Sequence, residues 1–197
     1  MKKLLLFVLC MCVTVAAFAQ DEAAFAQAEH MTFKGIPMDC DISTFVSRME
    51  AKGYTLEYPC DEYALMSGRF AAKDECKIYI YCTEDLKLVY QVIVSFPEYS
   101  RWDTLRDEYY LFKEAYTEKY GEPESQEYFL SPYCEGDGYE MSAVEGDYCR
   151  YSSFYETPSG KIVLWIGSGK NVLVAYRDHI NNSIKDDETH RSIAADI

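Results

Sequence analysis

The stretch KDECKIYIYC, residues 73–82, decides the fold class because its side chains alternate with the period of a β-strand. Ile78 and Ile80 lie on one side of such a strand, and Tyr79 and Tyr81 lie on the other. An apolar side opposite an aromatic side is typical of an antiparallel sheet that buries one face fully. We therefore expect a sheet with helices on one side and rings on the other.

The same stretch limits what its two cysteines can do. Cys76 and Cys82 are six positions apart, so a strand separates them by roughly 20 Å. A disulfide requires Cα atoms within about 7 Å, and one metal ion requires its ligands to be closer still. The two cysteines therefore neither bond to each other nor share a metal ion. We expect both thiols to be buried and unreactive, because no base neighbours them.

Strand patterns recur on both sides of this stretch. Six further runs are rich in β-branched and aromatic residues and are bounded by short turns. These runs cover residues 54–58, 64–71, 88–96, 148–157, 161–167 and 172–178. The turns PSG and SGKN predict that the last three runs form successive hairpins.

One helix is predicted before each group of strands. Residues 41–53 form a short amphipathic pattern with Asp41 as the N-cap. A longer helix ends at Gly121, and Ser100 with Asp103 resembles a capping box at its start. Its buried stripe consists of residues three or four positions apart: Leu105, Tyr109, Phe112, Tyr116 and Tyr120.

This order predicts an α+β fold made of two helix-plus-antiparallel-meander units. The units would form one sheet of about seven strands, with the helices packed on one face. Residues 31–180 would make a single domain, with possible repeat halves at 31–97 and 98–180. A polar, acidic loop is expected at 131–149, and a polar, partly helical tail at 181–197.

The N-terminus has the features of a secretory signal peptide. Lys2 and Lys3 precede an apolar run that ends in an A-x-A motif. Cleavage after Ala19 would remove residues 1–19 and leave a flexible lead at 20–30. The mature protein would then be periplasmic or secreted. No later apolar run is long enough to span a membrane.

Charge argues against two classes of partner. The chain has 33 acidic and 19 basic residues, a formal net charge of −14. Removal of the signal peptide with its two lysines leaves 17 basic against 33 acidic residues, or −16. Such acidity argues against nucleic acid and anionic lipid as partners. It either serves solubility or favours a basic partner protein.

The usual catalytic and metal-binding patterns are missing from the sequence. GSGK at 167–170 resembles the end of a phosphate-binding loop, but its place between two strands indicates a hairpin turn. The three histidines lack zinc-site spacing, and no GxSxG motif occurs. The acidic runs at 135–140 and 186–188 do not match a calcium loop and are expected to be solvated. We therefore expect neither a metal nor a cofactor, whereas a mechanism based on carboxylates alone stays open.

Several segments carry a family resemblance. FKGIPMD (33–39), FVSRMEAKGY (45–54), FKEAYTEKYGEP (112–123) and FYETPSGKIVLWI (154–166) resemble a large uncharacterised family of proteins secreted by Gram-negative bacteria. The layout is similar to tandem helix-and-sheet folds such as β-lactamase-inhibitor protein and small outer-membrane assembly lipoproteins. The first resemblance implies export but no activity, and the second implies architecture alone. Neither assigns a function to any residue.

Aromatic residues mark a candidate binding surface. Tyr79 and Tyr81 alternate with core positions on one strand, and Trp165 does so on another. On an open sheet face these rings would supply large contact area at low entropic cost. The competing interpretation is cross-strand packing that only stabilises the sheet. The leading hypothesis is an exported, soluble binding or inhibitory module with a protein or glycan partner. The alternative is a carboxylate-based hydrolase or lyase acting on envelope or extracellular glycans.

Export to an oxidising compartment favours disulfides for the remaining cysteines. The first strand is expected to return antiparallel to the first helix, which would bring Cys60 beside Cys40. Cys134 and Cys149 bracket the acidic loop. We therefore predict the bonds Cys40–Cys60 and Cys134–Cys149, with Cys76–Cys149 as a rival to the second.

Overall fold

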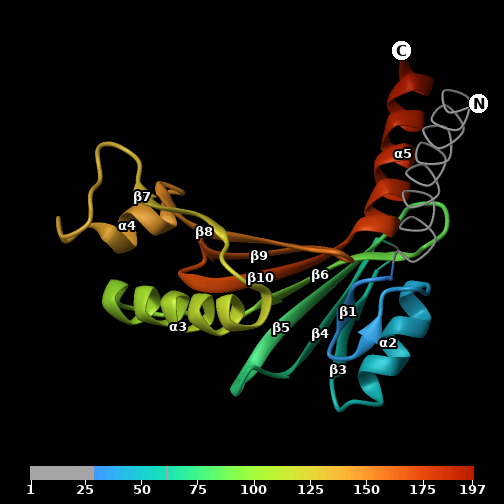
Figure 1. Ribbon diagram of the computed structural model, residues 1–197, viewed down its shortest axis with the longest axis horizontal. Coiled ribbons are helices and arrows are strands. Elements are labelled where there is room, and N and C mark those ends of the chain that lie inside the picture. The colour runs from blue at the N-terminus through green and yellow to red at the C-terminus, as the bar shows by residue number, and fades with distance from the viewer. Residues whose placement is uncertain (1–28, 61) are drawn as a thin grey trace, which may run out of the picture.

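A computed structural model describes residues 29–60 and 62–197, and Figure 1 presents it as a ribbon. Within these residues the protein has an α+β structure with four helices and ten strands. The predicted signal peptide at 1–19, and nearly all of the predicted lead at 20–30, lie outside the described residues.

Two helix-plus-meander units follow one another along the chain. The first consists of α2 (Ile42–Glu50), β3 (Thr55–Pro59), β4 (Tyr63–Phe70), β5 (Lys73–Cys82) and β6 (Val89–Ser95). The second consists of α3 (Trp102–Tyr120), β7 (Glu124–Phe129), β8 (Cys149–Thr157), β9 (Gly160–Gly167) and β10 (Asn171–Asp178). Each unit therefore contributes one helix and four strands to the fold.

These eight strands form one antiparallel sheet in the order β3-β4-β5-β6-β10-β9-β8-β7. The two units meet where β6 pairs with β10, from Leu173 opposite Ser95 to Arg177 opposite Gln91. The sheet has one strand more than the expected seven. The additional strand, β7, lies at an outer edge and is mostly exposed, so its residues ESQEYF show no clear apolar alternation.

Helices α2 and α3 pack on the same face of this sheet, which we call the core face (Figure 1). α2 contacts β4 and β5, and α3 contacts β8, β9 and β10. Ile78, Ile80 and Leu164 point into this face and are 0% exposed. Burying an aliphatic side chain of this size contributes roughly 1.5–3 kcal/mol, so the core face provides most of the hydrophobic stabilisation.

The two helices begin in different ways. Asp41 caps α2 as predicted, because its Oδ1 accepts a hydrogen bond from the backbone N–H of Thr44 at 3.0 Å. The capping box predicted for α3 is wrong. Its N-cap is Arg101, whose Nε donates to Asp103 at 3.0 Å, and no side chain caps the helix.

A small hairpin, β1 (Thr32–Phe33) with β2 (Ile36–Pro37), lies on the core-face side between α2 and α3 (Figure 1). Its two-residue turn consists of Lys34 and Gly35, which have φ values of 53° and 71°. The ring of Phe33 stacks on that of Phe70 with centroids 5.4 Å apart. The hairpin is thereby anchored to the end of β4.

Two further helices complete the described chain. α4 (Glu140–Glu145) lies within the segment expected to be a loop at 131–149. α5 (His179–Asp196) occupies the segment expected to be a polar tail, and it rises from the end of β10 on the side away from α2 and α3 (Figure 1).

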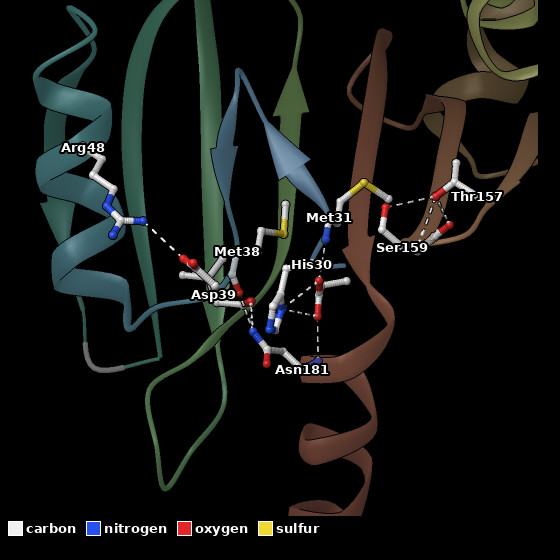
Figure 2. Close-up of polar contacts among 11 residues, drawn as sticks. His30, Met31, Met38, Asp39, Arg48, Thr157, Ser159 and Asn181 are labelled. Carbon is white, nitrogen blue, oxygen red and sulfur yellow. Dashed lines mark hydrogen bonds and ion pairs between the residues drawn. The ribbon is translucent and has the colours of Figure 1, made fainter. Parts of the chain in front are cut away.

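A buried carboxylate joins α5 to the N-terminal residues. Asp178 is 0% exposed and accepts hydrogen bonds from the backbone N–H groups of Asn181 and Met31, both at 2.7 Å. The ring of His30 lies against the same carboxylate, and the side chain of Asn181 donates to the carbonyl of Met38 at 2.6 Å (Figure 2). This network fixes the start of the described chain against β10 and α5.

Candidate binding face of the sheet

The face opposite to α2 and α3, called the open face below, has an apolar row across six strands. The residues that the register places side by side are Leu65, Tyr79, Ile93, Ala175, Val163 and Phe154. Ala175 is buried, and the other five are partly exposed. Side chains that meet in this way across a sheet form a continuous surface.

Four tyrosines of the first unit form a ladder beside this row. The ring centroids lie 6.4 Å apart for Tyr58 and Tyr63, 5.9 Å for Tyr63 and Tyr81, and 6.5 Å for Tyr81 and Tyr90. Each ring comes from a different strand, from β3 to β6. Burial raises the pKa values of Tyr81 and Tyr90, so both keep their hydroxyl protons at neutral pH.

The three residues predicted as a binding surface line one shallow hollow of about 430 Å³. Tyr79 and Tyr81 come from the first unit and Trp165 from the second, and Ile93 and Leu173 lie between them in the same hollow. The hollow therefore spans the junction of β6 and β10, where the two units meet.

Exposure follows the predicted alternation. The three rings are partly exposed, whereas their chain neighbours Ile78, Ile80 and Leu164 are 0% exposed. Tyr81 belongs to the tyrosine ladder and so also packs within the sheet. Tyr79 and Trp165 make no ring–ring contact anywhere in residues 29–60 and 62–197.

Two lysines on this face have acidic partners, whereas Arg177, which the register places opposite Lys161, donates to the neutral side chain of Gln91 at 2.9 Å. Lys77 pairs with Glu57 at 2.7 Å, and Lys161 pairs with Glu156 at 2.6 Å. Exposed pairs of this kind contribute only about 0–1 kcal/mol each. They neutralise Lys77 and Lys161 beside the apolar row, in a chain whose formal charge is −14.

The six cysteines of the described residues are thiols, so neither predicted disulfide is present in the structure. Cys76 and Cys82 are buried on the same strand face as Ile78 and Ile80, as expected. Burial raises the pKa of Cys76, and it raises the pKa of Cys149 to about 12. These two thiols are therefore poor nucleophiles at neutral pH.

The strand order separates Cys40 from Cys60. The carbonyl of Cys40 accepts a hydrogen bond from the N–H of Val89 at the start of β6, at 3.1 Å. Cys60 begins the turn between β3 and β4, so β4, β5 and β6 lie between the two cysteines. At about 4.8 Å per strand, this exceeds the reach of a disulfide. The expected return of the chain beside the start of α2 does not describe this sheet.

The bond between Cys134 and Cys149 stays a prediction. Their chain neighbours Tyr133 and Tyr148 have ring centroids 5.2 Å apart, so the two ends of the segment lie close together. Cys134 is exposed and Cys149 is buried.

Carboxylates of the acidic segment at 135–140 are used in local contacts. Glu135 accepts hydrogen bonds from Arg106 at 3.0 Å and from the Tyr151 hydroxyl at 3.1 Å. The Arg106 guanidinium lowers the pKa of Glu135. Asp137 accepts from the N–H of Tyr139 at 2.7 Å. Across the described residues, no cluster of three or more His, Cys, Asp and Glu side chains could hold a metal ion.

GSGK at 167–170 forms the turn between β9 and β10, as predicted. The N–H of Lys170 donates to the carbonyl of Gly167 at 3.0 Å, which closes the turn. The ammonium group of Lys170 pairs with Glu145 at 2.5 Å. The segment is therefore a hairpin turn, and its lysine is used in a local ion pair.

One acid–imidazole pair was not visible in the sequence. His30 and Asp178 are 148 positions apart, yet Nδ1 lies 3.2 Å from Oδ2 (Figure 2). Hydrolases use such pairs to orient an imidazole, but its second nitrogen must then face a nucleophile. Within the part of the chain that the structure describes, no hydroxyl or thiol forms a hydrogen bond with Nε2 of His30. We assign the pair to holding the chain against α5.

Comparison with protein-family models, curated proteins and solved structures finds no match for this chain. The resemblance to secreted proteins of Gram-negative bacteria therefore stays a prediction. No helix among the described residues is both long enough and apolar enough to cross a membrane.

Proposed function

We propose that this chain is an exported binding or inhibitory module that contacts a protein partner through the open face. The observation that carries the proposal is the apolar row together with the hollow lined by Tyr79, Tyr81 and Trp165. Both lie on the sheet face that α2 and α3 leave uncovered. Partly exposed aromatic side chains in a concave, apolar setting are the usual anchors of protein interfaces.

Charge supports a partner of particular chemistry. The chain is strongly acidic, and Lys77 and Lys161 beside the apolar row are already neutralised by carboxylates. A partner with an apolar patch flanked by lysine and arginine would be complementary in both respects. Its association should slow as salt is added, because screening weakens the attraction between the two surfaces.

The alternative of a carboxylate-based hydrolase or lyase has weaker support. Glu127 binds Lys113 at 2.5 Å, and Glu135 binds Arg106 at 3.0 Å, so both acids serve as ion-pair partners. Among the described residues, no contact or pKa shift distinguishes one pair of carboxylates as an acid and a base.

Site-specific photo-crosslinking in the native host tests the proposal. A photoreactive phenylalanine analogue replaces Tyr79 on the open face or, as the control, Leu111, which is 55% exposed on α3. We expect one discrete protein adduct from position 79 and none from position 111. Adducts from both positions, no adduct, or an adduct with glycan alone would each overturn a protein partner at this face.

Affinity for the partner identified by the cross-link gives the second test. Replacing both Tyr79 and Trp165 with alanine should weaken binding by about 1–2 kcal/mol or more, as expected for interface anchors. The melting temperature should change little, because neither ring contacts another ring of the described chain. Leu111→Ala is the matched control and should leave the affinity unchanged.

A further inference from the structure

A second cavity lies on the other side of the sheet, between the β1–β2 hairpin and α3. Its volume is about 330 Å³, within the range of sites for small ligands. Four aromatic residues from three elements line it: Phe70, Tyr116, Tyr120 and Tyr176. We call it the hairpin pocket. It has no lining residue in common with the hollow on the open face.

Two lysines line the hairpin pocket and have no acidic partner. The ammonium of Lys34 lies 5.7 Å from the ring centroid of Phe70, and that of Lys119 lies 4.8 Å from the ring centroid of Tyr120. Neither forms an ion pair within residues 29–60 and 62–197, whereas twelve other lysines and arginines there do. In a chain with 33 acidic residues, two such cations at one cavity leave a place for an external anion.

A hydroxyl proton is available in the same pocket. The hydroxyl groups of Tyr116 and Tyr176 form a hydrogen bond with each other. Two hydroxyls carry two protons, and their mutual bond uses only one of them. The remaining proton has no acceptor among the described residues. Burial raises the pKa of both phenols, so the proton stays in place at neutral pH.

The two turns that border the pocket have unusual backbone conformations. Lys34 in the β1–β2 turn has a φ of 53°, and Ala71 and Ala72 in the β4–β5 turn have φ values of 46° and 65°. Glycine or asparagine is usual at such positions, because other side chains disfavour them. Two-residue hairpin turns require positive φ at their central residues, so the β1–β2 turn fixes the position of Lys34. Its ammonium group is held over the ring of Phe70.

We propose that the hairpin pocket binds a small carboxylate with an apolar or aromatic body. The acid group would lie near Lys34 and Lys119 and accept the unused hydroxyl proton of the tyrosine pair. The body would pack against Phe70 and Tyr120. The proposal goes beyond the function of the open face and is independent of it, because the two sites lie on opposite sides of the sheet.

Nuclear magnetic resonance titration of the purified, ¹⁵N-labelled protein tests this site with defined probes. Phenylacetate and hexanoate supply an acid with an aromatic or an aliphatic body. Phenylacetamide and phenethylamine are the neutral and cationic counterparts of the first. We expect at least one acid to shift the amide signals of Lys34 and Lys119 saturably. The neutral amide should bind at least tenfold more weakly than phenylacetate, and the amine should not bind.

Variants of the pocket lysines test whether these residues contribute to binding of the acid. Lys34→Gln combined with Lys119→Gln should weaken binding of the acid at least tenfold. Lys52→Gln is the matched control, because Lys52 is an exposed lysine outside the pocket that forms no ion pair with any described residue. This variant should bind the acid as the unmodified protein does. Melting curves establish that all variants are folded. Tyr79→Ala and Trp165→Ala on the open face should leave acid binding unchanged.

Several outcomes would overturn the proposal. These are equal binding of phenylacetate and phenylacetamide, full binding by the double lysine variant, signal shifts that centre on the open face, and no saturable shift with either acid.

Discussion

The two faces of the eight-stranded sheet are built from the same strands, but they differ in how far their side chains are buried. On β9, Leu164 points into the core face and is 0% exposed, while the next residue, Trp165, lies partly exposed in the open-face hollow. Both faces carry apolar side chains, so hydrophobicity alone does not separate them. The helices distinguish the two faces, because α2 and α3 both pack on the same side of the sheet. A face rich in rings that these two helices leave uncovered is thus available for contact with another molecule.

The largest expected effect comes from replacing each of these two neighbours on β9 with alanine, one at a time. Leu164→Ala should lower the free energy of unfolding by about 2–5 kcal/mol, because it leaves a cavity in the core face. Trp165→Ala should lower it by about 1 kcal/mol or less. Urea unfolding followed by circular dichroism measures both. Equal losses would show that the open face is part of the core, and the comparison would fail.

Alkaline pH should test the burial of the tyrosines on the core-face side. Burial raises the pKa values of Tyr109, Tyr116 and Tyr176 on the core-face side above the ordinary value of 10.0. Since their pKa values are higher in the folded than in the unfolded state, their stabilisation is complete below about pH 10 and is lost as the pH rises toward the folded values. We expect cooperative unfolding above pH 10, with a joint rise in phenolate absorbance.

Tyr116→Phe should move that alkaline midpoint upward, because it removes one group whose ionisation favours the unfolded state. Gradual ionisation of all 18 tyrosines without loss of circular dichroism would contradict the assignment.

A smaller effect should distinguish two rings on the open face itself. Tyr81→Ala removes ring contacts with Tyr63 and Tyr90, whereas Tyr79→Ala removes none within the described residues. Each aromatic pair contributes about 0.5–1.5 kcal/mol beyond area burial. The Tyr81 variant should therefore be less stable than the Tyr79 variant by about 1 kcal/mol or more in thermal unfolding. The reverse order would assign Tyr79 to packing and weaken its role as a contact residue.

The last prediction involves no change in stability and compares how accessible the cysteine thiols are on the surface and in the core. In the reduced, folded protein, Cys60 and Cys134 are exposed, whereas Cys76 and Cys149 are buried. Iodoacetamide at pH 8 should label the first two well before the others, as peptide mass spectrometry would reveal. Early labelling of Cys76 would mean that the core face opens readily. Mapping of the oxidised protein then tests the predicted Cys134–Cys149 bond.

Periodicity was sufficient to predict the strands that form the interior of the sheet. β5 and β9 alternate clearly because one of their faces is fully buried. β7 was missed, since at an exposed edge polar residues are tolerated on both sides. α5 was expected to be only partly helical, because few of its residues are buried and no apolar stripe marks it. Local hydrophobic patterns in the sequence thus indicate which residues are buried more than they indicate secondary structure.

The candidate site was predictable only in part. Alternation indicated that Tyr79, Tyr81 and Trp165 share the open face, but it did not indicate that they line one hollow. That depends on β6 pairing with β10, a contact between residues about 80 positions apart. The partners of Tyr79 in the apolar row, Ile93 and Leu65, depend on the register for the same reason. The hairpin pocket was not visible at all, because its lining comes from distant parts of the chain.

The pairing of β6 with β10 also has a consequence for folding. Every other pair of neighbouring strands in the eight-stranded sheet is consecutive in the chain, so each unit can pair its strands by closing local connections, the longest of which is residues 130–148 with α4. Only the β6–β10 ladder, from Leu173–Ser95 to Arg177–Gln91, joins strands that are distant in sequence. Cleavage of the connection at residues 96–101 would leave α2 with one complete meander on the first fragment, and α3, α4 and α5 with the other meander on the second. The chain is thus suited to division into two complementary fragments, whose reassembly would report on the closing of this central ladder.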